Sequence, residues 1–317
     1  MDLKTFLFAI AIILSGFTTL NAQLTYARLA PEFDKSWTCG RLKLVPIRLK
    51  DPVKGKNDLA GESIISFEKA MREGKISVKE TNTSGGDDVS LLVVKNRSGK
   101  NILVNSGEIV AGGMQDRAFG GTIIIPPDRR KHYLPVFCVE KGRWTRKTKA
   151  KSFRYAGSVD ASLRKQIDIS KKQNKIWKEI DKLLVDNGIR SDTRAYLDLF
   201  KDTARVDTSC MHFFRSKMME TDSAYVGFVA ITGYRIINCE LFGNIDLCRA
   251  SFETTVKGYL RSITINDVHP DVSNAEVKEF LDKFMQTEEQ QKKYLSKNGR
   301  LYTRNGLPVH LIAYDDK

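Results

Sequence analysis

The sequence lacks the local signatures of several large enzyme classes. It contains no G-x-S-x-G nucleophile elbow, no H-E-x-x-H zinc motif, no P-loop, and no G-x-G-x-x-G between a strand and a helix. Its histidines are few and scattered, at positions His132, His212, His269 and His310. Ser-His-Asp hydrolysis and zinc hydrolysis are therefore poorly supported, and we expect neither a metal nor a cofactor.

Cysteine is also scarce, and its spacing resembles no zinc site because the sequence has no C-x-x-C. The count of five is odd, which in an exported chain leaves at least one thiol free. The sequence is compatible with two pairings, Cys239 with Cys248 and Cys39 with Cys138. We treat the neighbouring Cys210 and His212 as a chance juxtaposition, not as a metal pair.

Long apolar runs are absent beyond the first residues, so no membrane span is expected in the rest of the chain. Residues 1–22 resemble an export signal, with Lys4 as a basic start, an apolar run over 6–13, and the small residue Ala22 at the end. We predict cleavage near Ala22 and a mature bacterial protein in the periplasm or outside the cell. An uncleaved N-terminal anchor is the alternative, although no stop-transfer pattern follows Ala22.

Acidic residues are outnumbered, with 38 Asp and Glu against 52 Lys and Arg and a formal net charge of +14. This excess favours anionic neighbours such as acidic glycans, lipopolysaccharide or nucleotides. Residues 141–155 are especially rich in Lys and Arg and contain no acid. They read either as a solvated linker or as an anion-facing loop with Trp144, Phe153 and Tyr155 as stacking surfaces. No nucleic-acid-binding module accompanies them, so nucleic acid is not the expected partner.

Alternating apolar residues predict strands throughout the first half, over residues 37–50, 76–78, 89–95, 102–110, 122–125 and 133–139. Ser66 is the predicted cap of a short helix over 67–73. Pro46 predicts an edge or a bend in the first strand. We therefore expect a β-rich half over residues 23–145, folded as a sandwich or a strongly curved sheet.

The second half has helical periodicity. One face of a long helix runs from about Ser158 to Leu184, and Asn187-Gly188 ends it. A second helix follows a cap at Ser191. The expected architecture is therefore α+β, with a signal peptide over 1–22, a basic linker over 146–157, and an α+β half over 158–317 that is free to pack with the first half as one domain.

Two hairpins are expected in this second half. Residues 225–242 form the strongest strand pair, with its turn at Thr232-Gly233. Asn305-Gly306 predicts the closing hairpin, and Pro308 places its last strand at an edge. Helices are expected after Asn244 or Asp246 and after Asn274.

Polar residues gather in the stretch 102–144, between apolar strands that would not need them for packing. A hairpin geometry would bring them to one face. Two arginines would clamp an anion, and two glutamates would accept hydroxyl protons or act as bases. The candidate ligand-binding residues are Glu108, Gln115, Asp116, Arg117, Glu140, Arg143 and Trp144. The weak catalytic candidates are Glu108, Cys138 and Glu140.

A structural interpretation of the same stretch stays open. Glu108 would then pair with Arg117 and Glu140 with Arg143, since buried charges are paired whether or not they do chemistry. Cys138 is similarly either a reactive thiolate beside the arginines or a core cysteine or half-disulfide.

The stretch also resembles a known family. The residues that carry the resemblance are Gly107-Glu108, Gly112 to Arg117, and above all Cys138 to Trp144. The segments Gln173 to Trp177 and Leu241-Phe242-Gly243 extend it, so that it covers roughly residues 30–265. The family is a bacterial domain of unknown function named for its association with ADP-ribosylglycohydrolase and rhodanese/phosphatase-superfamily domains. The resemblance implies no catalytic residue, and by association only it implies a ligand such as ADP-ribose, a nucleotide or another phosphorylated small molecule.

Three functions follow as expectations. The first is an exported protein that binds an anionic small molecule or glycan at the 108–144 surface. The second is a hydrolase or transferase acting on an ADP-ribose-like or phosphorylated substrate, although the residues do not establish an enzyme. The third is a cell-envelope interaction protein with no small-molecule site, which uses its positive charge alone.

Overall fold

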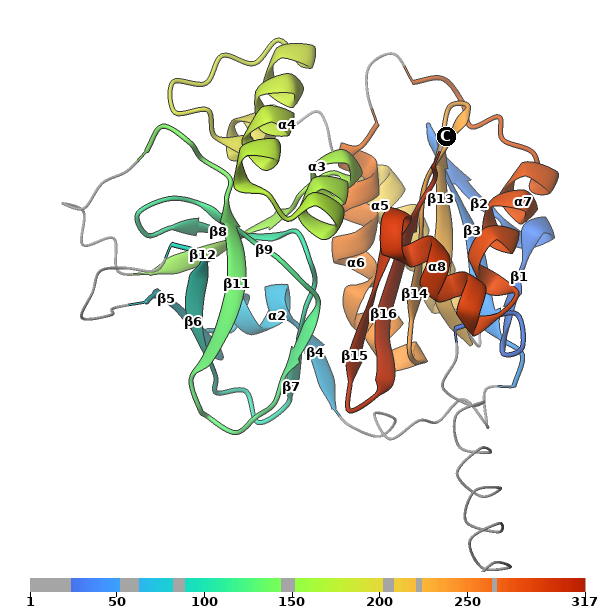
Figure 1. Cartoon of the computed structure of the whole chain (residues 1–317), viewed down its shortest axis with the longest axis horizontal. Helices are drawn as coiled ribbons and strands as arrows, with labels where there is room; N and C mark the ends of the chain where they lie inside the picture. Colours follow the sequence, from blue (N-terminus) through green and yellow to red (C-terminus); the bar gives the residue numbers. More distant parts are fainter. Residues whose placement is uncertain are drawn as a thin grey trace, which may run out of the picture.

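One antiparallel sheet contains strands from both ends of the chain (Figure 1). The computed structural model describes residues 24–51, 63–81, 89–143, 152–201, 208–220, 224–263 and 267–316. The strand order is β1-β3-β13-β14-β16-β15, with β2 also paired to β3. The strands are β1 (Leu29–Pro31), β2 (Trp37–Cys39), β3 (Leu42–Leu49), β13 (Tyr225–Thr232), β14 (Arg235–Phe242), β15 (Gly299–Arg304) and β16 (Leu307–Tyr314). Residues 29–49 therefore belong to the same sheet as the C-terminal strands.

Both predicted hairpins are present in this sheet. Strand β13 is buried along its whole length, and Gly233 makes the turn to β14 with a φ of 52°. Asn305 and Gly306 join β15 to β16 with φ values of 52° and 78°, as a two-residue turn requires. The edge position predicted from Pro308 is wrong, because β16 lies between β14 and β15. Pro308 is tolerated there because the register shifts between Tyr302 and Thr303, its partner.

Pro46 likewise does not mark an edge, since β3 is hydrogen-bonded to β1 and β2 on one side and to β13 on the other.

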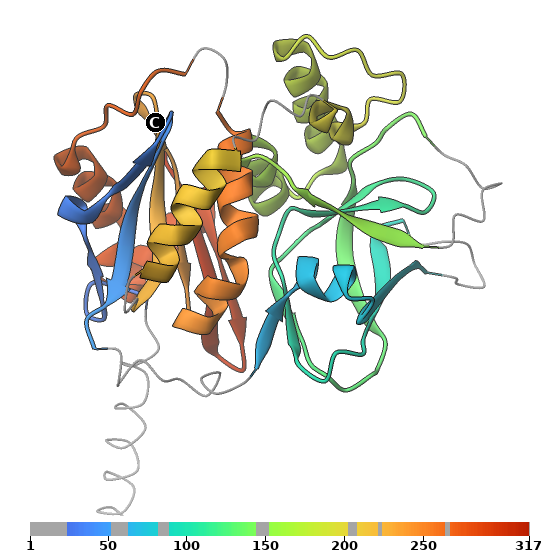
Figure 2. The same cartoon turned by 180° about the vertical axis from the view of Figure 1, so that it is seen from behind.

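Helices cover both faces of the sheet (Figure 2). On one face, α5 (Thr208–Glu220) and α6 (Ile245–Arg261) pack over residues such as Trp37 and Phe228. On the other face, α7 (Asn274–Met285) and α8 (Glu288–Asn298) pack over residues such as Val229. We call this sheet with α5 to α8 the α/β lobe.

The predicted helix starts in this lobe are nearly correct. Asn244 caps α6 by accepting a hydrogen bond from the Leu247 amide. The cap of α7 is Ser273, one residue before the predicted Asn274, and it forms a reciprocal capping box with Glu276. Boundaries of this kind depend on local hydrogen bonds, so an error of one residue is expected.

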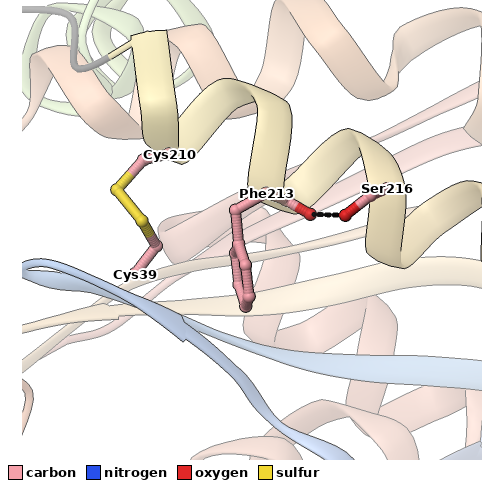
Figure 3. The surroundings of a disulfide bond; sticks show 4 residues. All are labelled: Cys39, Cys210, Phe213 and Ser216. Atoms are coloured by element: carbon pink, nitrogen blue, oxygen red, sulfur yellow. Dashed lines mark hydrogen bonds between the residues drawn. A yellow bond between two sulfur atoms is a disulfide. The ribbon is translucent and has the colours of Figure 1, made fainter.

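A disulfide joins Cys39 of β2 to Cys210 of α5 (Figure 3). Both pairings compatible with the sequence are therefore wrong, and Cys138, Cys239 and Cys248 are buried free thiols. The two bonded cysteines are 171 residues apart and meet only because α5 packs against β2. The spacing of the cysteines in the sequence does not predict that contact.

The second lobe, over residues 63–158, is a curled sheet as the sequence predicts. Six strands run in the order β12-β8-β9-β11-β6-β5, and three more in the order β10-β7-β4. Helix α2 (Phe67–Arg72), capped by Ser66, packs against the enclosed core. We call this the β lobe. Its strands are β4 (Ile64–Ser66), β5 (Ile76–Glu80), β6 (Leu91–Asn96), β7 (Asn101–Val104), β8 (Glu108–Gly112), β9 (Arg117–Phe119), β10 (Ile123–Ile125), β11 (His132–Cys138) and β12 (Phe153–Ser158).

The single long helix predicted from Ser158 is wrong. Ser158 ends β12, and Asp160 caps a short helix α3 (Ala161–Lys165), which continues as the π-turn η2 (Gln166–Ser170). Lys171 then has a φ of 50°, and α4 (Gln173–Asp186) starts in a new direction. Apolar periodicity alone does not detect this break, because a π-turn shifts the pattern by one residue without removing it. The fold is completed by the 3₁₀ turns η1 (Phe33–Lys35) and η3 (Tyr196–Phe200).

Residues 1–22, predicted as an export signal, lie outside the described residues. Of the expected basic linker over 146–157, the residues from Phe153 onward are part of β12. None of the helices in the described ranges is both long enough and apolar enough to cross a lipid bilayer.

Candidate functional site

Arg143 is held by two carboxylates at the end of β11. Its Nε donates to Glu140 Oε2 at 2.7 Å, and its Nη2 donates to Asp116 Oδ1 at 2.9 Å. A third bond runs from Nη1 to the carbonyl oxygen of Gly113 at 3.2 Å. The pairing of Glu140 with Arg143 that the structural interpretation predicts is therefore present. Three predicted site residues, Asp116, Glu140 and Arg143, are brought together.

The loop after α4 completes this cluster. Thr193 donates its hydroxyl proton to Glu140 Oε1 at 2.9 Å, and Gly142 donates its amide proton to the Thr193 carbonyl at 2.7 Å. A Cβ at position 142 would lie 2.9 Å from Thr193 Cα, so only glycine permits this approach. The Gly142 of the C-V-E-K-G-R sequence is thus needed to dock a segment that is distant in the chain.

An open groove of about 840 Å³ lies beside the cluster. We call it the arginine groove, defined by Asp116, Glu140, Arg143, Arg154, Arg190 and Phe200. Arg154 comes from β12 and Arg190 from the loop after α4, and both side chains are exposed. Within the described part of the chain, neither of these two guanidinium groups has a hydrogen-bond or ion-pair partner.

Some of the charged side chains in the arginine groove form ion pairs and others do not. Arg143 is paired with two carboxylates, a set with one negative charge in excess, and Lys201 pairs with Asp198 at 2.7 Å. Arg154 acts electrostatically on Asp116, and Asp192 is one further acid of the lining. Burial raises the pKa of Asp116, and the nearby charge of Glu140 raises that pKa further, against the opposing effects of the Gly112 amide and Arg143. The lining carries four basic and four acidic side chains, so its formal charges balance. What the groove offers an anion is the two guanidinium groups of Arg154 and Arg190, which are held in no ion pair within the described part of the chain.

Glu108 lies elsewhere, fully buried at the start of β8. Its Oε2 accepts the Asn105 amide proton at 2.6 Å, whereas Arg117 donates to Gln115 Oε1 at 3.0 Å. The predicted Glu108–Arg117 pair is therefore wrong. Arg117 and Gln115 do not line the groove, whereas Asp116 between them does, because successive residues of an extended segment point to opposite faces.

Cys138 is buried and free, and burial raises the pKa of its thiol despite the opposing charge of Arg117. Both of its backbone polar groups are bound by the Gln173 side chain, at 2.9 and 2.8 Å. This contact joins α4 to β11 in the way a neighbouring strand would. Trp144 lies outside the described residues.

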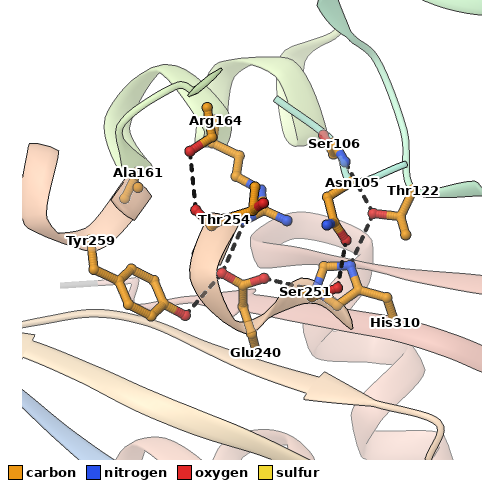
Figure 4. Close-up of polar contacts among 12 residues, drawn as sticks. Asn105, Ser106, Thr122, Ala161, Arg164, Glu240, Ser251, Thr254, Tyr259 and His310 are labelled. Carbon is orange, nitrogen blue, oxygen red and sulfur yellow. Dashed lines mark hydrogen bonds and ion pairs between the residues drawn. The ribbon is translucent and has the colours of Figure 1, made fainter. Parts of the chain in front are cut away.

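A buried polar network between the two lobes contains residues that the sequence analysis did not identify (Figure 4). Glu240 of β14 accepts hydrogen bonds from Arg164 and Tyr259, both at 2.9 Å, and binds His310 of β16 at 2.9 Å. The other ring nitrogen of His310 lies 3.1 Å from the hydroxyl of Thr122, which belongs to the β lobe. An ionised Glu240 fixes the proton on His310 Nε2, so Nδ1 accepts the proton of Thr122.

A second carboxylate, Asp168 of η2, is also completely buried in this network. It accepts hydrogen bonds from Ser106 at 2.5 Å, Tyr302 at 2.7 Å and Tyr314 at 2.8 Å. Together the contacts of Asp168 and Glu240 tie β-lobe loops to the α/β lobe. The π-turn that interrupts the predicted long helix is what places Asp168 in this position.

The ionisation of the network follows from its contacts. Burial alone would raise the pKa of Glu240, but the Arg164 charge and the His310 contact outweigh burial and lower that pKa to about 2. Burial lowers the pKa of His310, which is therefore neutral at ordinary pH. The available sequence signal was a polar residue at an apolar strand position, as at Glu240 between Cys239 and Leu241. Each residue lies on a different element, so no local motif connects them.

Comparison with known proteins identifies one family. The family model described as ARPP-1, the ARG and Rhodanese-Phosphatase-superfamily-associated Protein domain, matches residues 30–310. This is the family that the stretch 107–144 resembles, and the match includes both lobes. No curated protein and no solved structure shows a significant match to the chain.

Proposed function

The chain belongs to the ARG and Rhodanese-Phosphatase-superfamily-associated Protein domain family, and from this premise we propose that it is an exported protein that binds an anionic small molecule or glycan in the arginine groove. One observation carries the proposal. Arg154 and Arg190 converge on this open groove from separate segments, and each guanidinium is exposed without a partner among the described residues.

The chemistry of the groove favours an anion that also carries hydroxyl groups. A guanidinium presents paired N–H donors that match carboxylate or phosphate oxygens. The neighbouring carboxylate of Asp192 is an acceptor for hydroxyl protons. Phe200 adds an aromatic side chain to the lining, with one face of its ring covered by the Arg261 guanidinium at 3.8 Å. A volume of about 840 Å³ is suited to a ligand of the size of a sugar phosphate or a short acidic glycan.

The hydrogen-bond partners and the burial of the candidate catalytic residues favour binding over hydrolysis or group transfer. Glu140 is already occupied by Arg143 and Thr193, so it is not free to act as a base. Glu108 and Cys138 are buried and do not line the groove. No reacting group is therefore assigned to the arginine groove.

A thermal-shift screen tests the proposal. The mature protein would be screened against sugar phosphates, acidic glycans, nucleotides and ADP-ribose at low salt. We expect at least one class to raise the melting temperature of the wild type. Arg154→Ala and Arg190→Ala should each reduce that shift, because each removes one of the two available guanidinium groups.

The matched control is Arg97→Ala, which removes the same charge from the exposed turn between β6 and β7, outside the groove. This variant should keep the full shift. An equal loss of shift in all three variants would mean that only net charge matters, as expected for an envelope protein without a small-molecule site. The absence of a shift with every ligand class would contradict the proposal.

A further inference from the structure

Arg117 is a fully buried guanidinium with no carboxylate partner. Its one hydrogen bond runs from Nη1 to the neutral amide oxygen of Gln115, and both Nε and Nη2 are buried without a partner. Arg164 provides the contrast, since it is also buried but lies 2.9 Å from Glu240 and 3.7 Å from Asp168. Buried charges are normally compensated, so Arg117 lacks a counter-charge that Arg164 possesses.

The side chain of Arg117 lies inside the curled sheet of the β lobe. In the strand registers, Arg117 is opposite Val110 of β8 and Cys138 of β11, and Val110 belongs to the enclosed core. Near this end of the core lies Glu80, whose Oε1 accepts the Met114 amide proton at 3.0 Å. The other carboxylate oxygen, Glu80 Oε2, is also buried without a partner.

Glu80 and Arg117 both bind the same short segment, because Glu80 accepts the amide proton of Met114 and Arg117 donates to the side chain of the next residue, Gln115. They are nevertheless not an ion pair with each other within 4.0 Å. One buried group thus has donors without an acceptor, and a neighbouring group has an acceptor without a donor. A single bound molecule that offers both functions would satisfy the two groups at once.

The two unpartnered nitrogens of Arg117 define the ligand. Nε and Nη2 form one edge of the planar guanidinium, and their N–H bonds point in parallel as a fork. Such a fork matches two oxygens on one central atom, as in phosphate or carboxylate. We propose that Arg117 binds a small oxyanion inside the β lobe, and that a hydroxyl group of this oxyanion donates to Glu80 Oε2. The simplest such species is singly protonated or doubly protonated inorganic phosphate.

This site is separate from the arginine groove. Arg117 is on the inner face of β9, whereas Asp116 faces the groove on the outer face. The inference therefore does not depend on the proposed function. Sulfate serves as a test of the second contact, because at neutral pH it carries no hydroxyl proton to donate to Glu80.

Equilibrium dialysis of the full mature chain against radiolabelled inorganic phosphate tests the site. We expect about one phosphate per chain, retained in the presence of a roughly tenfold excess of sulfate. Arg117→Met should bind none, and Glu80→Gln should lose the preference for phosphate over sulfate. The double variant Arg154→Ala/Arg190→Ala should retain the bound phosphate, because its changes lie in the groove.

Arg117→Lys distinguishes a loss of phosphate binding from a loss of folding, since it keeps the positive charge and removes the paired N–H donors. It should weaken phosphate binding by roughly tenfold or more while its circular dichroism spectrum stays that of the wild type. The absence of bound phosphate in the wild type would overturn the proposal. So would retention in Arg117→Met or Arg117→Lys, or a loss seen only in the groove double variant.

Discussion

Glu240 and His310 form a hydrogen bond of 2.9 Å between two side chains that are both fully buried. The imidazole of His310 also contacts Thr122 of the other lobe, and the carboxylate of Glu240 also binds Arg164. This pair is therefore the centre of the contact between the β lobe and the α/β lobe. Its residues are polar in a place where most folds use apolar side chains, so its integrity should dominate the stability of the lobe contact.

Removal of the Glu240 charge should destabilise the protein strongly. Glu240→Gln leaves the buried Arg164 guanidinium with only Asp168, at 3.7 Å, as a charged partner. We expect the free energy of unfolding to fall by about 3–5 kcal/mol, measured by urea denaturation. Lys292→Ala, which removes an exposed pair with Glu288, should change it by less than about 1 kcal/mol. A similar small change for both variants would contradict the assignment of Glu240 as a central contact.

Glu108 should make stability depend on pH in the opposite sense to an ordinary carboxylate. Burial raises the pKa of Glu108 from 4.5 to about 8, so the folded state holds a proton that the unfolded state releases. Its contribution to stability is fully present below pH 4.5 and is lost as the pH rises through 8. Glu108→Gln mimics the protonated form and should gain stability relative to the wild type as the pH increases over this range. The free energy of unfolding of both proteins would be measured from about pH 5 to about pH 8. A constant difference between the two proteins over this range would show that Glu108 does not titrate in this way.

The Cys39–Cys210 disulfide should stabilise the attachment of α5. Loss of this bond in Cys39→Ser should reduce the free energy of unfolding by about 2–4 kcal/mol, chiefly because a long loop in the unfolded chain is no longer closed. Denaturant titrations with and without a thiol reductant measure the effect. The reductant should destabilise the wild type and leave Cys39→Ser unchanged. A reductant effect of equal size in both proteins would place the sensitive bond elsewhere.

Gly142→Ala should displace the loop that carries Arg190. The new methyl group would lie 2.9 Å from Thr193 Cα and 3.0 Å from its carbonyl oxygen, so Thr193 must move away from Glu140. We expect a loss of about 1–3 kcal/mol in unfolding free energy and a smaller ligand-induced thermal shift. If both quantities match those of the wild type, the close approach of these two segments does not position the groove.

The elements that the sequence predicts correctly are those with a local signal. The hairpin turn at Asn305-Gly306, the Ser66 cap and the apolar arms around Gly233 each depend on neighbouring residues, and all three are present. The family resemblance was likewise local, since it rested mainly on the short stretch from Cys138 to Trp144.

Contacts between distant segments are not predicted by the sequence. Cys39 finds Cys210 only through the packing of α5, and the π-turn at Asp168 is stabilised by tyrosines from the last two strands. The candidate stretch is rich in ionic contacts, as its composition indicates, but only one of its two predicted ion pairs is present. Glu140 pairs with Arg143 at a sequence distance of three. Glu108 and Arg117 lie on paired strands, but Glu108 binds the Asn105 amide and Arg117 binds the Gln115 side chain instead of each other.

The most direct measurement of anion binding in the arginine groove is a calorimetric titration with the compound that gives the largest thermal shift. The wild type, Arg97→Ala and the double variant Arg154→Ala/Arg190→Ala would be titrated under identical low-salt conditions. We predict similar dissociation constants for the wild type and Arg97→Ala, and a loss of affinity of about a hundredfold or more in the double variant. Equal affinity in all three proteins would contradict binding in the groove.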